Sequence, residues 1–335
     1  MILLDKLIVS PSPHQKKPIT TTKVMLMVII SLIPAIVAST VFFGAKALLL
    51  VANCVAWCLI FEIASRKIMK RSNTITDLSA VVTGILLALN FPVTLPLWMS
   101  IIGCFVAIVI VKQLFGGLGQ NFANPAIVGR IVLMLSFTSE MTTWVKPFWY
   151  KTADLTTSAT PLAMEWTTVY ESTSGFFPAT EPPVAYMDLF LGNVGGCIGE
   201  TSALALLIGG LFLLSTRIIT PAIPVTFIGT VALLTAVTGG DPLYAVLSGG
   251  LILGAFFMAT DYVTSPITTK GKIIFGIGCG LITFLIRTYG SYPEGVSFSI
   301  LLMNILTPYI DKMTRTKPLG AIKPVREKKE AKSNG

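Results

Sequence analysis

The sequence predicts an all-α integral membrane protein with about ten transmembrane helices, and three observations support this fold class. Of the 335 residues, 53% are hydrophobic and 12% are charged, and the mean hydropathy is +0.78, which is too apolar for a soluble domain. Apolar runs near the roughly 20 residues that cross a bilayer recur along the chain. Basic residues gather in segments that a ten-span chain places on one side of the membrane.

The predicted spans form two halves on either side of a long polar loop. The first half covers residues 24–138, the loop 139–185 and the second half 186–311, between an N-terminal segment, 1–23, and a basic tail, 312–335. The spans themselves are predicted over 24–44, 47–65, 77–92, 96–114, 124–138, 186–216, 218–238, 243–260, 271–288 and 295–311.

The charges orient this arrangement in the membrane. Lysines precede the first span, basic clusters follow the second and the eighth, and the tail 312–335 is strongly basic, whereas the loop 139–185 is acidic. Since positive segments stay inside, both termini are predicted in the cytoplasm and the loop outside. The net charge of +9 therefore reflects topology, and no basic patch interleaved with aromatic residues predicts nucleic-acid binding.

The two halves are predicted to be inverted repeats. About five spans on each side of the loop make the halves face opposite ways across the membrane. The segments 84–96 and 254–266 also share residues in register, namely Gly84/Gly254, Val93/Val263, Thr94/Thr264 and Pro96/Pro266. Both segments end an apolar run with Pro and polar residues, which predicts helices broken within the membrane, where protein or a cavity must cover the freed backbone.

Two glycine-rich segments also predict broken helices. GGLGQNFANPAIVGR (116–130) contains Asn121 and Asn124, and GNVGGCIGETS (192–202) contains Glu200. Glycine permits either a turn or close helix packing, so these segments indicate either the walls of a ligand site or tight packing. Neither matches a nucleotide-binding fingerprint.

Charged residues within the spans are informative because each costs about 3 kcal/mol to insert unless it is paired or hydrated. Asp77, with Ser79 and Thr83 on one face, and Asp261, beside Thr260 and Thr264, are candidates for an ion path or a polar cofactor, as is Glu200. For Glu62, Lys112 and Arg287, near the ends of spans, the favoured interpretation is snorkelling to the membrane surface.

Several kinds of chemistry are excluded or disfavoured. The single histidine, His14, excludes a serine–histidine–aspartate relay and a site with several histidine ligands. All five cysteines lie in predicted spans, so no disulfide framework is indicated. Cys54 and Cys58 share a helix face, which suggests either metal ligation or, more commonly, packing of small thiols. We therefore predict no metal site and no complete active site in this chain alone.

A hydroxyl-rich tract in the polar loop, DLTTSATPL (154–162), resembles the sequence recognised by flavin transferases. These enzymes join FMN through its phosphate to a threonine hydroxyl in the pattern Asp-x-x-Ser/Thr-Gly-Ala-Ser/Thr. Asp154, Thr157, Ala159 and Thr160 match the pattern, and Ser158 replaces the usual glycine. The resemblance makes Thr160 the expected acceptor, and Pro161 discourages helix formation around it.

The chain as a whole resembles the NqrB/RnfD family, the D subunits of Rnf complexes and, more distantly, the B subunits of sodium-translocating NADH:quinone reductases. The blocks that carry this resemblance are SPSPH (10–14), TDLSAVVTGILLALNFP (76–92), GGLGQNFANPAIVGR (116–130), TSATPL (157–162), GCIGETS (196–202) and FFMATDYVTSP (256–266). They occur in the family's order over nearly the whole chain, and the short N-terminal segment favours the Rnf branch.

The resemblance implies a membrane electron-transfer subunit of a complex that moves electrons between ferredoxin and NAD and exports Na⁺ or H⁺. FMN would be esterified to Thr160 outside a bacterial or archaeal plasma membrane. A second, non-covalent flavin such as riboflavin, or a quinone, is implied near the bundle, with Asn121, Asn124 and Glu200 as candidate walls. The implied partners are the A, B, C, E and G subunits, above all the flavoprotein G, together with a flavin transferase and membrane lipid.

An alternative function is a secondary transporter or channel for a small polar solute. An inverted bundle with broken helices and acids at membrane depth is what such a protein also contains. The tract at 154–162 separates the two hypotheses, because a transporter does not need a flavin acceptor.

Overall fold

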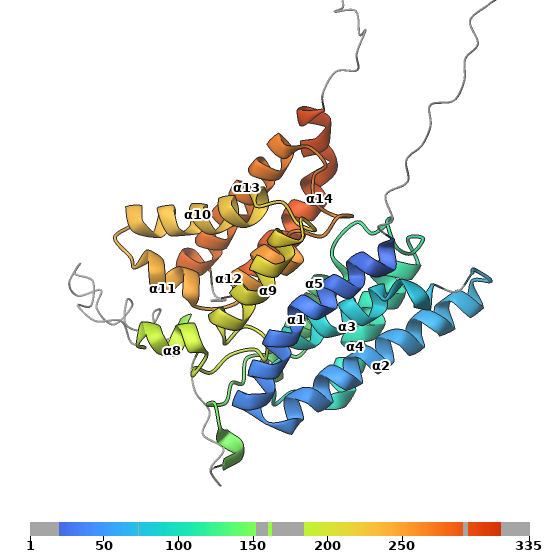
Figure 1. Cartoon of the computed structure of the whole chain (residues 1–335), viewed down its shortest axis with the longest axis horizontal. Helices are drawn as coiled ribbons and strands as arrows, with labels where there is room; N and C mark the ends of the chain where they lie inside the picture. The colour runs from blue at the N-terminus through green and yellow to red at the C-terminus, as the bar shows by residue number, and fades with distance from the viewer. Residues whose placement is uncertain (1–19, 73, 152–159, 163–183, 291–293, 316–335) are drawn as a thin grey trace, which may run out of the picture.

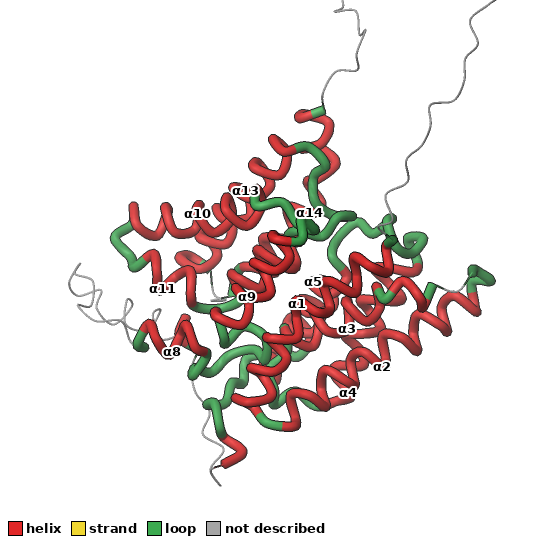
Figure 2. Tube along the Cα trace, in the orientation of Figure 1, coloured by secondary structure: helices red, strands yellow, loops and turns green. Residues whose placement is uncertain are grey.

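The computed structural model describes residues 20–72, 74–151, 160–162, 184–290 and 294–315. These residues form helices joined by loops, and no strand is found among them (Figure 2). Five residues singled out in the sequence, His14, Asp154, Thr157, Ser158 and Ala159, lie outside the described residues.

The described residues of the first half and of the start of the polar loop form five main helices and three short elements. The first two helices form an antiparallel pair that lies along one side of the molecule (Figure 1). The main helices are α1 (Thr21–Phe43), α2 (Ala45–Ile68), α3 (Ser79–Leu89), α4 (Leu97–Phe105), which continues as the π-helical segment η2 (Val106–Gln113), and α5 (Pro125–Ser136). The short elements are η1 (Ile75–Asp77), α6 (Thr138–Met141) and η3 (Trp149–Lys151).

The described residues of the second half form two pairs of long helices, with short helices before each pair. The long pairs are α9 (Ala203–Ser215) with α10 (Ala222–Val237) and α13 (Thr269–Tyr289) with α14 (Val296–Thr314). The short ones are α8 (Tyr186–Leu191), α11 (Pro242–Leu247) and α12 (Leu251–Leu253), which continues as the π-helical segment η5 (Gly254–Met258).

Three of the described helices, α1, α2 and α13, are long and apolar enough to cross a membrane. Shorter apolar helices cover Ser79–Leu89, Leu97–Gln113, Pro125–Ser136, Ala203–Ser215 and Ala222–Val237. The single spans predicted over 186–216 and 243–260 are each interrupted. Gly192 and Gly249 stand at these breaks with φ of 107° and 66°, a backbone conformation that favours glycine. The predicted interruption within 192–202 is therefore confirmed.

Side-chain caps fix where the helices near the interruptions begin. The Asn124 side chain accepts a hydrogen bond from the Ala126 backbone N–H at 3.0 Å and so caps α5, with Pro125 in the first helical turn. The Ser202 hydroxyl accepts from the Ala205 N–H at 3.3 Å and caps α9. Both glycine-rich segments thus contain the cap that starts the next helix.

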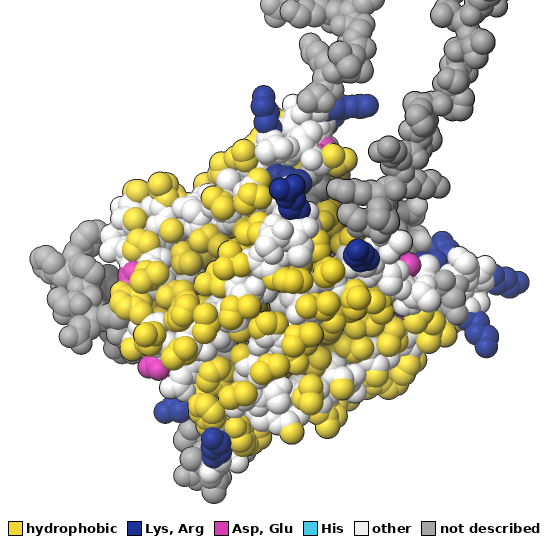
Figure 3. Space-filling model, in the orientation of Figure 1, with side chains coloured by type: hydrophobic (Ala, Val, Ile, Leu, Met, Phe, Trp, Pro, Cys, Tyr) yellow, Lys and Arg dark blue, Asp and Glu magenta, His cyan; other side chains and the backbone are white. Residues whose placement is uncertain are grey.

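The two halves meet along two helix pairs, α1 with α9 and α5 with α14, and in Figure 1 α9 lies beside α1. One continuous core of buried apolar residues runs through both halves and includes Leu32, Leu87, Phe227 and Phe275. Exposed apolar side chains cover much of the outer surface over α1 and α2 (Figure 3). Such a surface suits a protein surrounded by lipid.

The contact between α1 and α9 depends on Gly209. A Cβ atom at this position would lie 2.0 Å from the carbonyl oxygen of Ser31, so a side chain would force the two backbones apart. We expect Gly209→Leu to lower the midpoint of thermal unfolding by several degrees, because overpacking a tight contact costs about 1–3 kcal/mol. The matched control is Gly229→Leu on α10, where no atom lies within 4 Å. Equal unfolding midpoints for the two variants in detergent would contradict this packing.

Candidate functional site

A cavity that is partly open to the surroundings lies between the two halves, and its empty space, including the open part, is about 790 Å³. Its walls are mostly apolar and come from both halves, with Val28 and Leu86 on one side and Phe256 and Phe257 on the other. We call it the inter-half cavity. An apolar cavity with a few polar groups is the usual form of a site for a small organic molecule.

Both asparagines of the first glycine-rich segment line the inter-half cavity. The Asn124 side-chain amide donates to the carbonyl oxygen of Met258 in the second half at 3.2 Å. The Oδ1 atom of Asn121 is buried and has no hydrogen-bond partner among the described residues. A buried acceptor without a partner is costly, so the cavity wall offers this oxygen to a ligand that can donate a hydrogen bond.

Of the two acids predicted to line a polar path, Asp77 and Asp261, only Asp261 lies on the wall of the inter-half cavity. Asp261 accepts a hydrogen bond from the Thr264 hydroxyl at 3.1 Å. Asp77 lies half-buried in η1 and does not contribute to the cavity wall, although the following Ser79 and Thr83 do. The structure therefore brings Asp261, Ser79 and Thr83 together and leaves Asp77 beside them.

Lys112 and Glu62 do not snorkel, so that interpretation of the sequence is wrong for both. Each residue is 1% exposed, and the Lys112 ammonium lies 2.9 Å from a Glu62 carboxylate oxygen. The same ammonium donates to the Ser79 hydroxyl at 2.8 Å, and Glu62 also accepts from the Thr74 hydroxyl at 2.9 Å. Pairing inside the protein replaces the water that snorkelling would have supplied.

Arg287 does not snorkel either. The residue is 8% exposed, and its guanidinium donates to the carbonyl oxygens of Ala245 at 2.6 Å and Ser248 at 3.2 Å. These carbonyls lie at the C-terminal end of α11, where cationic groups are favourable. Arg287 thus fastens α13 to the short helix α11.

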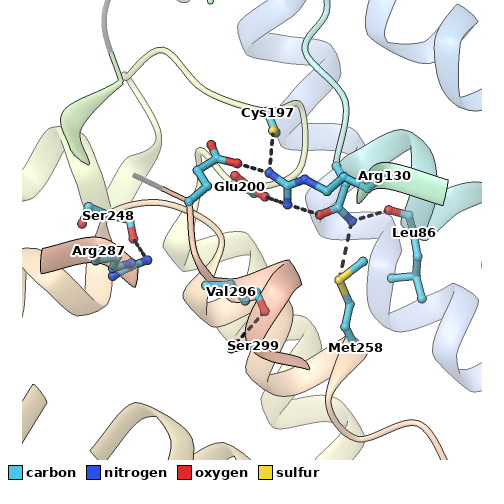
Figure 4. A network of polar contacts seen from close by, with 11 residues as sticks. Leu86, Arg130, Cys197, Glu200, Ser248, Met258, Arg287, Val296 and Ser299 are labelled. Carbon is cyan, nitrogen blue, oxygen red and sulfur yellow. Dashed lines mark hydrogen bonds and ion pairs between the residues drawn. The ribbon is translucent and has the colours of Figure 1, made fainter. Parts of the chain in front are cut away.

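A second polar group is centred on Arg130, in the middle of α5 (Figure 4). One guanidinium nitrogen donates to Asn90 Oδ1 at 2.6 Å and to Glu200 Oε1 at 2.7 Å. The other donates to Glu294 and, at 3.5 Å, to the Cys197 sulfur. We call these five residues the Arg130 cluster. Because Arg130 belongs to the first half and both carboxylates to the second, the cluster joins the halves.

The donor atoms of Cys197, Glu200 and Glu294 lie within 4.8 Å of one another, as metal ligands would. In this arrangement Arg130 donates to all three residues. The guanidinium therefore occupies the position of a cation. The structure also separates Glu200 from Asn121 and Asn124, so the second glycine-rich segment does not form a wall of the inter-half cavity.

Glu200 and Glu294 instead line a smaller, partly open cavity together with Thr160, and its empty space, including the open part, is about 340 Å³. We call it the Thr160 cavity. Thr160 is 5% exposed, and the next residue, Pro161, is held by the Tyr244 hydroxyl, which donates to its carbonyl oxygen at 2.8 Å. The expected acceptor thus lies directly beside the Arg130 cluster.

The remaining cysteines fit the packing interpretation. Cys54, Cys58 and Cys104 are all buried and free, and the Cys104 thiol donates to the Cys54 carbonyl oxygen at 3.5 Å. This contact links α4 to α2, and small thiols allow two helices to approach closely.

Comparison with known proteins decides the family. The profile of the NQR2, RnfD, RnfE family matches residues 8–320. The chain belongs to this family. It is 48% identical over 329 residues to the D subunit of the Na⁺-translocating ferredoxin:NAD⁺ oxidoreductase complex of Acetobacterium woodii, covering 98% of each chain.

Other members of the NQR2, RnfD, RnfE family are similarly close. The D subunit of the proton-translocating ferredoxin:NAD⁺ oxidoreductase complex of Clostridium ljungdahlii is 43% identical over 93% of this chain and 96% of its own. The D subunit of the ion-translocating oxidoreductase complex of Ectopseudomonas mendocina is 37% identical over 93% and 96%. The similarity to this family inferred from the sequence blocks is confirmed.

Sequence reasoning missed Arg130, Glu294 and Tyr244. Arg130 lies within the predicted span 124–138, so the cost of a charge inside the membrane was a signal that pointed to it. Glu294 lies between two predicted spans and looked like an ordinary loop residue. Tyr244 gave no signal, because its contact with Pro161 joins segments 83 residues apart.

We expect Arg130→Met to destabilise the protein by about 3–5 kcal/mol, because it leaves Glu200 and Glu294 buried without their cation. The measurement is thermal unfolding of the purified protein in detergent. Adding Glu200→Gln and Glu294→Gln to Arg130→Met removes the stranded charges and restores part of the loss. The control is Arg217→Met, at an exposed arginine. An unfolding midpoint for Arg130→Met equal to that of the control would show that the cluster does not hold the halves together.

Proposed function

We propose that this chain is the D subunit of an ion-translocating ferredoxin:NAD⁺ oxidoreductase complex. The observation that carries the proposal is similarity over nearly the whole chain to D subunits of such complexes. The names of these relatives specify sodium ions in one case and protons in the other. The proposal therefore includes coupling to either ion.

Within this function Thr160 carries FMN as a phosphate ester. The acceptor pattern supports this role, as does the position of Thr160 on the wall of a cavity. Glycines 195 and 196 form part of the same wall and leave room beside the hydroxyl. Since Thr160 is 5% exposed, a flavin transferase reaches it only when the segment around it moves away from the bundle.

The inter-half cavity is the proposed site of a second, non-covalent flavin. Phe256 and Phe257 offer an apolar wall for a flat ring, and Asn121, Asn124 and Asp261 offer polar groups for its edge or its ribityl chain. The partnerless Asn121 oxygen supports the fit. A flavin would supply one- and two-electron transfer at this position, whereas the protein supplies the pocket and its charges.

The proposed topology has ten crossings, both termini in the cytoplasm and inverted halves. Helix α2 contacts α3 and α4, and α10 contacts α11 and α13 in the corresponding order. In the aligned segments the helices end within one residue of the corresponding position, α3 at Leu89 and η5 at Met258. The helices that meet between the halves, α1 with α9 and α5 with α14, are corresponding members of the two repeats. Such contacts are expected when a two-fold axis relates the halves. The Thr160 segment lies outside the plasma membrane.

The candidates for the ion path are Asp261, on the wall of the inter-half cavity, and Asp77, which precedes the cavity residues Ser79 and Thr83. Glu200 is a weaker candidate because Arg130 holds it. The proposed partners are the A, B, C, E and G subunits of the complex, with the flavoprotein G receiving or supplying electrons, and a flavin transferase that modifies Thr160.

We expect this chain to fluoresce as a flavoprotein in a denaturing gel when it is produced with a flavin transferase. A phosphoester survives boiling in detergent, so the signal remains in the wild type and vanishes in Thr160→Ala. Ser158→Ala is the matched control, because it leaves the acceptor hydroxyl in place at the position where the tract departs from the pattern. Thr157→Ala also leaves that hydroxyl in place and keeps the signal unless it blocks recognition by the transferase. Fluorescence that persists in Thr160→Ala would exclude this residue as the attachment point.

A further inference from the structure

Lys112 is the only basic side chain on the wall of the inter-half cavity among the residues that the structure describes. It projects from η2 and is 1% exposed. Its ammonium contacts Glu62 at 2.9 Å and Ser79 at 2.8 Å. Ser79 also lines the cavity, whereas Glu62 does not. The positive charge therefore lies between its carboxylate partner and the cavity.

The ammonium has a hydrogen-bond donor to spare. A lysine carries three N–H groups, and Glu62 and Ser79 accept two of them. None of the described residues is recorded as an acceptor for the third. A donor buried in this way favours a ligand that brings an acceptor into the cavity.

The backbone around the cavity is unusual on both sides. The two π-helical segments among the described residues are η2 and η5. The first supplies Lys112 to the cavity, and the second supplies Phe256 and Phe257 from the other half. Single π-helical turns occur frequently at functional sites, where they change the direction in which side chains point. Two such turns facing one cavity indicate a wall built around a ligand.

A role limited to stability explains these contacts poorly. A buried ion pair contributes little compared with apolar residues of the same size, because both charges lose their water. If the Lys112–Glu62 pair only stabilised the packing, its ammonium would not need to lie on the wall of a cavity. The aromatic wall suits a flat, aromatic ligand. The Lys112 ammonium calls for a hydrogen-bond acceptor on the edge of that ligand, and the partnerless Asn121 oxygen calls for a donor.

We infer that Lys112 binds the non-covalent flavin through an acceptor on the edge of its ring and favours the reduced form of that flavin. The inference rests on the proposed second flavin. When the ring takes one electron from a neighbouring redox centre of the complex, it gains one negative charge. The Lys112 ammonium offsets this charge electrostatically, and no bond is formed or broken in the protein.

The test uses the intact complex with two readouts, the amount of acid-extractable flavin and its midpoint potential in a spectroelectrochemical titration. The main variant is Glu62→Gln with Lys112→Gln, which removes both charges and keeps an amide pair. At a fixed potential we expect roughly tenfold less reduced flavin than in the wild type, or loss of the flavin. Lys112→Arg keeps the charge and retains the wild-type potential. The control is Lys67→Met, at an exposed lysine of α2.

Unchanged flavin content and potential in the double variant would overturn the inference. If that variant does not assemble, Glu62→Leu with Lys112→Met takes its place, because apolar residues of similar size commonly replace a buried ion pair without loss of stability. A wild-type complex that releases no flavin in acid would instead contradict the second flavin of the proposed function. The two failures are therefore distinguishable.

Discussion

The ion cluster around Arg130 is the interaction on which the arrangement of the two halves depends. A single guanidinium from α5 holds carboxylates from two separate segments of the second half. The hydrophobic effect cannot determine how the two halves pair inside a bilayer, because lipid solvates apolar side chains as well as protein does. A buried arginine without its carboxylates would be strongly unfavourable, so only one register of the halves is permitted.

The position of the cluster also relates the two cavities. Asn124 begins α5 at the inter-half cavity, and Arg130 lies six residues further along, a rise of roughly 9 Å. The carboxylates bound to Arg130 line the cavity that contains Thr160. One short helix therefore connects the proposed site of the dissociable flavin to the proposed site of the covalent one.

The interrupted helices are stable because each half satisfies the backbone of the other. The carbonyl oxygens of Leu89 and Phe91, at the end of α3 and just beyond it, accept hydrogen bonds from the N–H groups of Gly199 at 2.8 Å and Ile198 at 2.9 Å. Within a membrane, a broken helix is tolerated only when such partners exist. Gly199 is required at this crossing, since a Cβ atom there would lie 2.5 Å from Leu89 Cβ.

The sequence predicted local features well and tertiary pairings poorly. The caps and glycines that interrupt the helices at 116–130 and 192–202 act over a few residues, so their pattern is visible in the chain. The partners of Lys112 and Arg130 lie 50 and 70 residues away, and composition gives no measure of which charges meet. For that reason the sequence favoured snorkelling for Lys112 and grouped Glu200 with Asn121 on one wall.

The central claim is that this helical bundle carries electrons through a flavin on its own polypeptide. The most direct measurement is the intact mass of this chain, separated from the other subunits after production with a flavin transferase, followed by fragmentation of the peptide that contains Thr160. The account predicts a mass increase of one FMN less one water on that residue. An unmodified mass, or a flavin on another residue, would contradict it.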